Sequence, residues 1–223
     1  MCGRFAAGHL TQSQMLAIME NFLYGEIRHG DPTVPATQGY HIRPSQQVNM
    51  IRYDDQGFEL TTAAWQIADP RWSKKKVINS KIENVKWWHE YWDHGRRLIP
   101  ALGYYEWHQD TEQPMFITVR RNTPVLFFAG FYLTKAGQHQ CSILTRKPAH
   151  QIGKFHDRMP VILSPDEIQD WLTYTTKPEA AQKTLGVNWE GRFEFNDVKP
   201  LTKYSDGPEM IEPYEPPQAT LEF

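Results

Sequence analysis

The feature that most constrains the fold is a series of short, strand-like runs that fills the chain from residue 47 onward. The runs are rich in β-branched and aromatic residues, and turn signals such as DDQG and RRNTP separate them. In chain order they are QVNMIRY, FELTTAAW, RLIPALGYYEW, PMFITVR, PVLFFAGFYL, CSILT and MPVIL. This pattern predicts an α+β architecture with more strand than helix.

Three segments carry helical signals instead. TQSQMLAIMENFL has one apolar stripe behind Thr11, which is a suitable N-cap. IENVKWWHEYWDHGR predicts a helix with its tryptophans on and beside one face. SPDEIQDWL combines Ser164 as N-cap, Pro165 at the first helical position and Glu167 three residues after the cap, which is the signature of a capping box.

Size and composition limit the class of protein. A chain of 223 residues with 40% hydrophobic and 22% charged residues is typical of one folded domain, which we expect over residues 1–205, followed by an irregular tail over 206–223. The net charge of -2 excludes a strongly basic protein that coats duplex DNA, but it leaves room for a local basic patch. Only two cysteines are present, so we expect no disulfide framework and no cysteine-rich zinc site. Without a membrane-spanning run or signal peptide, we expect a cytoplasmic monomer that does not contact membranes.

Cys2 is the first candidate for chemistry, because removal of Met1 would leave it with a thiol and a free α-amine on adjacent carbons. The amine has a reference pKa of about 7.7–8.0, so much of it is unprotonated near neutral pH. The thiol becomes a good second nucleophile when a base or a cationic neighbour lowers its pKa. Such a 1,2-aminothiol reacts with an aldehyde by forming a Schiff base that closes to a thiazolidine ring. On position alone, chance explains a penultimate cysteine better.

Other candidates gain weight only if they converge on Cys2. Glu106 lies in GYYEW, where an aromatic setting raises a carboxyl pKa toward the range of a general acid or base. His156 and Arg158 lie in KFHDRMPVIL and offer a proton shuttle beside a phosphate-binding guanidinium. Asn79 and Lys81 lie in VINSKIENV and could hold a sugar oxygen and a phosphate. Each of these side chains, taken alone, is better explained as an ordinary core or surface residue.

The basic stretch RWSKKK places Trp72 next to three lysines, a combination suited to base stacking and backbone contacts in single-stranded nucleic acid. Most such runs are only solvated faces. The sequence has no glycine-rich phosphate loop, HExxH, paired-cysteine metal spacing or GxSxG. We therefore expect neither a metal nor an organic cofactor.

Several of these motifs follow one another over roughly the first 170 residues, in the order MCGRF, YHIRPSQ, AAW with DPRW, INSKIENV, ALGYYEW, ILT and HDRMPVIL. In this combination and order, the chain resembles the SRAP (SOS-response-associated peptidase) family. The resemblance implies a single SRAP domain with a mostly antiparallel, curved sheet and a few flanking helices. It also implies single-turnover capture of abasic sites in single-stranded DNA during the DNA damage response, through a thiazolidine link to Cys2. Crosslink reversal, lyase activity and autoproteolytic removal of Met1 belong to the same implied chemistry, as does association with the nucleoid when DNA is bound.

The resemblance also assigns roles to matching residues. Cys2 becomes the nucleophile, Asn79 orients the terminus and the sugar, Glu106 acts as acid and base, and His156 handles the sugar oxygen. The expected DNA contacts are Arg4, Arg43, Trp65, Trp72, Lys81, Thr145 and Arg158, with Lys81 and Arg158 as phosphate clamps.

Several positions depart from the family pattern. NSKIEN replaces the common NARxET, so Ser80, Lys81 and Asn84 stand where Ala, Arg and Thr are usual. Lysine keeps the charge but lacks the bidentate fork of arginine, so we expect a less directional grip on phosphate. YHIRP replaces the usual YNxAP, and its Arg43 adds a compensating charge. In addition, Gln66 stands where the family usually has glycine, and an NVxN-like pattern is not evident near the C-terminus.

Three other classes remain open from the residues alone. A class II glutamine amidotransferase also begins with MCG, but the chain has no recognisable glutamine-binding pattern. A cysteine autoprotease or peptidase could use the same Cys2. A non-enzymatic single-strand binder would make Cys2 incidental.

Overall fold

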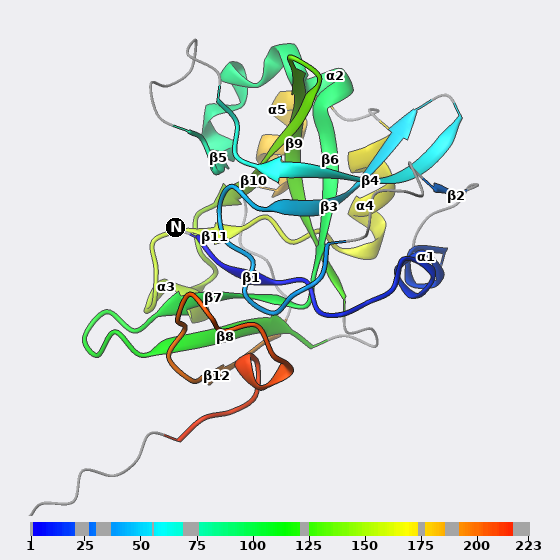
Figure 1. The fold of residues 1–223 in the computed structure, drawn as a ribbon. Coiled ribbons are helices and arrows are strands. Elements are labelled where there is room, and N and C mark those ends of the chain that lie inside the picture. Colours follow the sequence, from blue (N-terminus) through cyan, green and yellow to red (C-terminus); the bar gives the residue numbers. More distant parts are fainter. Residues whose placement is uncertain are drawn as a thin grey trace, which may run out of the picture.

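The structure is a computed structural model that describes residues 2–20, 27–29, 37–54, 56–68, 76–120, 125–173, 177–185 and 192–215. The described strands form two sheets, and the smaller one lies below the larger one in Figure 1. Helices cover the outside of the larger sheet, while the N-terminal strand runs between the two (Figure 1). The β-rich α+β class predicted from the sequence is confirmed.

The strands are β1 (Phe5–Ala6), β2 (Ile27–His29), β3 (Gln47–Asp54), β4 (Gly57–Trp65), β5 (Asn79–Lys81), β6 (Arg96–Ala101), β7 (Gly103–Trp107), β8 (Pro114–Val119), β9 (Leu126–Lys135), β10 (Gln138–Arg146), β11 (Met159–Pro160) and β12 (Phe193–Asp197). The helices are α1 (Gln12–Glu20), α2 (His89–Gly95), α3 (His150–Gly153), α4 (Pro165–Leu172) and α5 (Pro178–Leu185), with 3-10 turns η1 (Ile82–Trp87) and η2 (Pro208–Met210).

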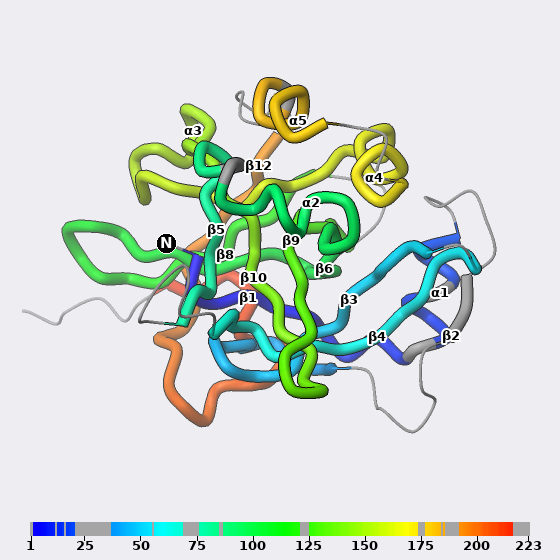
Figure 2. Tube along the Cα trace, turned by 90° about the horizontal axis from the view of Figure 1, so that it is seen from above, coloured from blue at the N-terminus to red at the C-terminus, as the bar shows by residue number. Residues whose placement is uncertain are grey.

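The larger sheet closes on itself. Its strands follow the order β11-β10-β9-β6-β3-β4-β2. The sheet closes because β10, near one end of this order, also pairs in parallel with β4, near the other end. Neighbouring strands from β10 to β4 along this path are antiparallel, as the family resemblance implied. β5 is added in parallel to β10, with Asn79 opposite Ile143 and Lys81 opposite Thr145. This pairing places β5 at the end of the molecule where the chain begins (Figures 1 and 2).

The smaller sheet has the order β1-β7-β8-β12, and all its pairs are antiparallel. β1 and β7 pair with Phe5 opposite Tyr104 and Ala6 opposite Gly103. A side chain at Gly103 would have its Cβ 2.4 Å from the ring of Phe116, so only glycine permits this close approach. The N-terminal residues are thus pinned beside the strand that carries Glu106.

The run RLIPALGYYEW differs from its prediction as one strand. It forms β6 and β7, which belong to different sheets and are separated by Leu102. The break is caused by strand pairing and not by residue propensity. β6 pairs with β9, but at Leu102 the chain changes partner, because the Leu102 N–H donates to the Ala6 carbonyl of β1 at 2.7 Å. The strands β1, β2, β5 and β12 are short additions that the sequence patterns did not indicate.

The predicted helix caps are present. Gln14 N–H donates to Thr11 Oγ1 at 3.2 Å, and Thr11 N–H donates to Gln14 Oε1 at 2.9 Å. α4 begins with the reciprocal capping box of Ser164 and Glu167 behind Pro165. The end of the first helical pattern, Phe22 and Leu23, lies outside the described residues.

The predicted single helix over IENVKWWHEYWDHGR is instead η1 followed by α2. The backbone at Asn84 (φ -97°, ψ 29°) is not helical. The break lets Trp88 enter the core, where its ring stacks on Phe131 with centroids 5.0 Å apart, while Trp87 is left half-exposed. Tertiary packing therefore overrides the helical pattern here.

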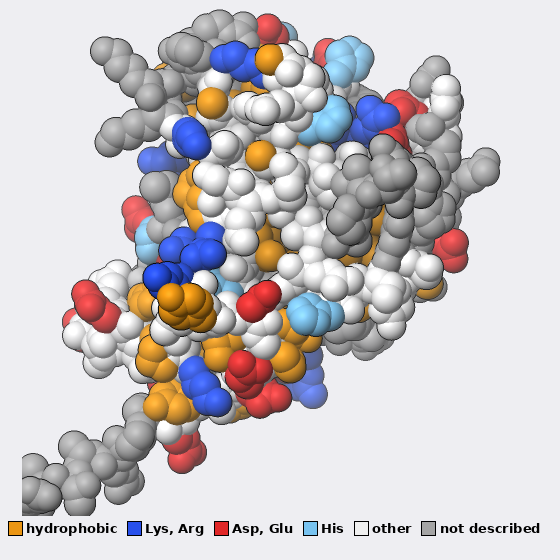
Figure 3. Space-filling model, viewed as in Figure 1, with side chains coloured by type: hydrophobic (Ala, Val, Ile, Leu, Met, Phe, Trp, Pro, Cys, Tyr) orange, Lys and Arg blue, Asp and Glu red, His pale blue; other side chains and the backbone are white. Residues whose placement is uncertain are grey.

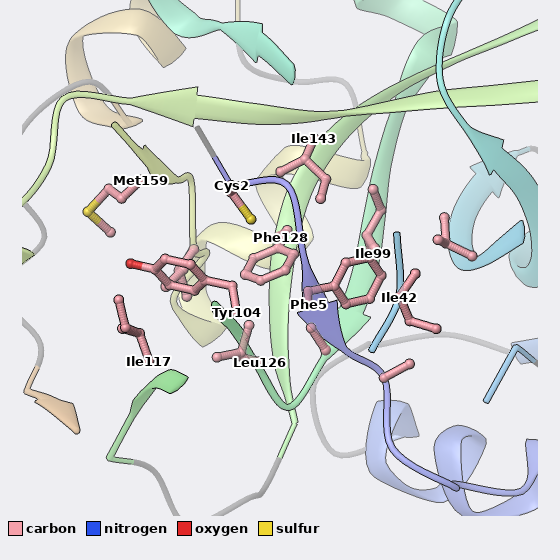
Figure 4. Packing of buried hydrophobic residues seen from close by; sticks show 14 of the residues in the cluster. Cys2, Phe5, Ile42, Ile99, Tyr104, Ile117, Leu126, Phe128, Ile143 and Met159 are labelled. Carbon is pink, nitrogen blue, oxygen red and sulfur yellow. The ribbon is translucent and has the colours of Figure 1, made fainter. Parts of the chain in front are cut away.

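A buried hydrophobic cluster surrounds the N-terminus and contains Cys2, Phe5, Tyr104, Phe128 and Met159 (Figure 4). Phe5 packs edge-on against Phe128 at 6.0 Å between ring centroids. Cys2 is therefore part of the hydrophobic core and not a frayed end.

Part of the predicted tail is packed. Asp206 Oδ1 accepts the N–H of Tyr40 at 2.8 Å, and Met210 is buried. Residues 216–223 lie outside the described part, and the domain boundary at 205 stays a prediction. Among the described residues, no helix is long and apolar enough to span a membrane.

Candidate active site

Cys2 is held in place by two elements that lie far from it in the sequence. Asn79 Nδ2–H of β5 donates to the Cys2 carbonyl at 2.8 Å, and Tyr105 N–H of β7 donates to the Arg4 carbonyl at 3.0 Å. The Cys2 thiol lies 3.8 Å from the Arg4 carbonyl and is fully buried. Figure 4 shows its sulfur directed into the cluster, toward Phe128. The first residues of the chain therefore have one defined position.

Burial controls the thiol. Desolvation and the nearby Glu106 carboxylate raise the pKa of Cys2, and the N-terminal positive charge and a backbone hydrogen bond with Arg4 oppose this only in part. The Cys2 thiol is therefore protonated at neutral pH. The activation by a cationic neighbour that we considered from the sequence does not prevail in this structure.

Glu106 is the general acid or base candidate, and its setting matches the prediction. It lies on β7 with only 3% of its surface exposed. Burial raises its pKa from 4.5 to about 7, while the N-terminal amine lowers it and Asp157 raises it further. At neutral pH, protonated and ionised Glu106 are both populated, so it can donate and accept protons.

Asn79 has two distinct ends. Its amide nitrogen anchors the Cys2 carbonyl, whereas its buried Oδ1 has no hydrogen-bond partner in the described structure. A buried amide oxygen without a partner loses roughly 1–3 kcal/mol relative to one in water. The oxygen is therefore available to accept a hydrogen bond from a bound group.

His156 follows α3 and is half-buried. Its Nδ1 accepts the N–H of Arg158 at 2.9 Å and also lies 2.8 Å from the exposed Asp157 carboxylate. One ring nitrogen cannot accept from the former and donate to the latter. Burial and the N-terminal amine lower the pKa of His156, which favours the neutral ring with Nδ1 as acceptor and the proton on Nε2.

These four predicted residues converge on the start of the chain. Asn79 bonds Cys2 directly, the charge of Glu106 raises the pKa of the Cys2 thiol, and the amine of Met1 lowers the pKa values of Glu106 and His156. They come from β5, β7 and the segment after α3, and Figures 1 and 2 both place β5 beside the N-terminus. Long-range pairing therefore assembles the site.

Arg158 and Thr145 are not surface residues, although both were predicted to contact DNA. Arg158 is 7% exposed and forms a bidentate ion pair with Glu83, with N–O distances of 2.7 and 2.9 Å. Its guanidinium also donates to the Thr145 carbonyl at 2.7 Å. Thr145 is 1% exposed and donates its hydroxyl to the Ser80 carbonyl. Thr145 thus supports both Arg158 and β5.

The prediction that Trp65 lines the DNA path is wrong for this structure. Trp65 has no exposed surface, its Nε1–H donates to the Ile78 carbonyl at 2.8 Å, and its ring packs against Phe5 at 5.3 Å. It is a core residue because β4 turns this side chain toward β1. Trp72 lies outside the described residues.

Positive charge gathers beside the site. Burial and the charge of Arg43 lower the pKa of Arg4, and burial with both arginines lowers the pKa of His41, so these groups lie close together. Lys81 is exposed at the end of β5. Figure 3 shows blue Lys and Arg side chains clustered where Figure 1 places the N-terminus. The described surface therefore has a local basic patch despite the negative net charge.

Two residues at the site were missed by the sequence analysis. Tyr104 is fully buried, and its pKa is raised by burial and by Cys2 and Glu106. The alternation of Tyr104 and Glu106 along one strand could have revealed that they share a face. Glu83, the partner of Arg158, had no signal beyond its position near Lys81.

Among the described residues, no group of three or more His, Cys, Asp and Glu side chains could hold a metal ion.

Comparison with known proteins gives one consistent result. Residues 1–203 match a family model described as SOS response associated peptidase (SRAP). The chain is 29% identical to the abasic site processing protein YedK of Escherichia coli over 96% of this chain and 100% of that protein. It is 30% identical to the abasic site processing protein YoaM of Bacillus subtilis, over 83% of this chain and 85% of that one.

Solved structures are similar as well. A phage-related protein of Bordetella bronchiseptica has 26% identity and a TM-score of 0.65, covering 89% of this chain and 95% of that chain. A protein from Bacteroides thetaiotaomicron has a TM-score of 0.75 over 96% of this chain and 100% of that chain, but at 16% identity it is similar in fold alone.

Proposed function

Because the chain belongs to the SOS response associated peptidase (SRAP) family, we propose that it processes abasic sites by capturing them covalently in single-stranded DNA through Cys2. The names of the relatives YedK and YoaM support abasic-site processing as the activity. The convergence of Asn79, Glu106 and His156 on the start of the chain supports the covalent step and carries this proposal.

The reaction begins with hydrolysis of the Met1–Cys2 peptide bond, which leaves the α-amine on Cys2. This amine adds to the aldehyde carbon of the ring-opened deoxyribose and forms a carbinolamine. Loss of one water molecule gives the Schiff base. The Cys2 sulfur then adds to the imine carbon while the thiol proton moves to the nitrogen, which closes the thiazolidine ring.

The amine acts before the sulfur in this sequence. Burial keeps the thiol protonated, so it is a poor first nucleophile, whereas the reference pKa of an α-amine is about 7.7–8.0. Protonated Glu106 donates the proton that leaves with water, and the resulting carboxylate takes the N–H proton of the carbinolamine, which gives the Schiff base and restores the acid. As the sulfur adds, Glu106 relays the thiol proton to the imine nitrogen. A carboxyl with a pKa of about 7 can carry out both transfers at neutral pH.

Asn79 and His156 orient the reactants. The free Oδ1 of Asn79 accepts an N–H of the new α-amine and directs its lone pair toward the aldehyde. Neutral His156 presents Nε2–H to the sugar ring oxygen and promotes ring opening. Arg4, Arg43 and Lys81 bind the flanking phosphates, and Arg158 joins them once its present partner is displaced.

The test incubates protein lacking Met1, verified by mass, with a single-stranded oligonucleotide that carries one abasic site. We expect a shift in electrophoretic mobility that survives denaturation. A tetrahydrofuran analogue, which has no aldehyde, serves as the control and should give no shift. Failure of the wild type to shift would contradict the proposal.

Two further arms separate the alternatives. Ammonia release from glutamine would favour an amidotransferase. The Cys2→Ser variant keeps the amine and should form an imine that borohydride reduction traps, without the stable ring that sulfur closes. If Cys2→Ala shifts as well as the wild type, Cys2 takes no part in the reaction.

A further inference from the structure

The guanidinium of Arg158 is already occupied by a carboxylate. Its two terminal nitrogens face the two oxygens of Glu83 at 2.7 and 2.9 Å, in the parallel arrangement that arginine also forms with a phosphate. A phosphodiester offers two non-bridging oxygens in the same geometry. Glu83 therefore stands where a DNA phosphate would bind this arginine.

The two partners differ in how firmly they are held. The Arg158 side chain is 8% exposed, and the Thr145 carbonyl accepts a third hydrogen bond from it at 2.7 Å. The Glu83 side chain is 38% exposed and lies in η1, a 3-10 turn that contains the irregular residue Asn84. Displacement of this pair would move Glu83 and leave Arg158 in place.

The surrounding charge makes Glu83 an effective anion. Burial alone would raise its pKa, but the hydrogen bonds and charge of Arg158 and the charge of Lys81 lower it overall. Glu83 is thus ionised at neutral pH, between the two cations that the family resemblance assigns to phosphate.

We propose that Glu83 competes with the DNA phosphate for Arg158 and thereby sets the affinity and selectivity of this subsite. The inference rests on the proposed function, because it takes single-stranded DNA as the ligand. A single phosphate cannot displace a bidentate carboxylate that shares a chain with its partner. A strand that also contacts Arg4, Arg43 and Lys81 supplies several phosphates at once, so the subsite selects polyanions over small anions.

The test uses fluorescence anisotropy to measure non-covalent binding of a labelled single-stranded oligonucleotide that carries the tetrahydrofuran analogue, which has no aldehyde. All variants carry Cys2→Ala, which separates this result from success or failure of covalent capture. Glu83→Gln removes the charge and keeps the shape, and we expect Kd to fall about fivefold. The gain should be larger for short oligonucleotides, which bring fewer additional phosphates.

Two variants show whether the gain acts through Arg158. In the Arg158→Gln background, Glu83→Gln should increase the affinity for DNA by no more than the small amount expected from removing one negative charge. That small gain is measured with Glu20→Gln, an exposed residue of α1, which both views place far from the N-terminus (Figures 1 and 2). Above about 0.1 M salt, the Glu83→Gln gain should persist while the Glu20→Gln effect disappears.

A purely structural ion pair gives a different result. Glu83→Gln would then lower the midpoint of thermal unfolding and weaken DNA binding, and that outcome overturns the proposal. Unchanged affinity with unchanged stability also overturns it, as does a protein that binds no single-stranded DNA. Glu83→Ala repeats the measurement in case the glutamine amide forms a new bond to Arg158.

Discussion

The two tyrosines on opposite faces of β7 differ in whether their buried hydroxyls form a hydrogen bond. Tyr104 and Tyr105 are both fully buried, but the Tyr105 hydroxyl donates to the Tyr40 carbonyl at 2.6 Å, whereas the Tyr104 hydroxyl has no hydrogen-bond partner in the described structure. In Figure 4 the Tyr104 hydroxyl extends to the side of Met159 and Ile117. The Tyr104 face also carries Glu106 and packs beside Cys2. On the Tyr105 face, the buried tyrosine hydroxyl has its hydrogen-bond partner, as is usual in a protein core.

The difference indicates where the fold gives up stability. Buried polar atoms are normally paired, and an unpaired one costs roughly 1–3 kcal/mol. At the site, Tyr104 Oη and Asn79 Oδ1 both lack partners, and the carboxyl of Glu106 is held where its charge is disfavoured. Such local conflicts are expected where a site serves a reaction more than the stability of the fold.

The two buried cysteines give the largest test of this contrast. Cys2 and Cys141 both have no exposed surface and raised pKa values caused by burial, yet only Cys2 lies beside Asn79 and Glu106. Cys2→Ala should lower covalent capture by about three orders of magnitude or more. Cys141→Ala should leave the capture rate within about twofold of the wild type in the same gel assay; a large loss would show that burial alone cannot distinguish the two.

Glu106→Gln should give the next largest effect. Loss of the acid and base should slow capture about 100-fold at pH 7. In wild-type protein, the rate that depends on protonated Glu106 should fall as pH rises through about 7, and this dependence should be absent in the variant. Single-turnover rates from pH 5.5 to 8.5 provide the measurement, with the exposed Glu112→Gln as a charge-matched control.

The same carboxyl should affect stability in the opposite sense to a salt-bridged acid. Its pKa rises from 4.5 to about 7 on folding, so the folded state binds more protons than the unfolded state between these values. The free energy of unfolding should therefore decrease by a few kcal/mol as pH rises from about 4.5 to above 7. Urea unfolding across this range should show a flatter profile for Glu106→Gln; identical profiles would refute the raised pKa.

Asn79→Ala should have a moderate effect. It removes the hydrogen bond to the Cys2 carbonyl and the free acceptor, so the terminus is less well oriented. We expect capture to slow about tenfold, in line with roughly 1.4 kcal/mol for one buried hydrogen bond. Asn49→Ala removes a similar buried amide that bonds Thr37 away from Cys2, and the same rate assay should show little change for it.

The smallest effect tests the tyrosine contrast directly. Tyr104→Phe removes a buried hydroxyl without a partner and should raise the free energy of unfolding by about 1 kcal/mol. Tyr105→Phe leaves the Tyr40 carbonyl without its hydrogen-bond donor and should lower the free energy of unfolding by about the same amount. Chemical denaturation of both variants decides the point; changes of equal sign would mean that the two faces of β7 do not differ.

Local sequence patterns were sufficient for several elements. The alternating and apolar runs placed β3, β4, β8 and β9, because β-branched and aromatic residues between turn signals favour strands in any context. The caps of α1 and α4 depend on residues three positions apart, so they too can be predicted from the sequence. MCGRF likewise drew attention to Cys2, whose catalytic role stays a prediction.

Burial and long-range pairing were decided only in three dimensions. Nothing in a linear pattern separates an arginine that binds phosphate from Arg158, which is buried against Glu83, 75 residues away. Trp65 was expected to contact DNA from the family resemblance, but it is a core residue because β4 directs it toward β1. RLIPALGYYEW divides between two sheets because its halves find different partners.

The reason is the range of the forces involved. Propensity, capping and reactivity of a terminal cysteine depend on a few neighbouring residues. Desolvation, which raises the pKa of Glu106 and keeps the Cys2 thiol protonated, depends on which distant side chains exclude water. Those neighbours are chosen when β1 pairs with β7 and β5 with β10, so the chemistry of the terminus becomes defined only in the folded chain.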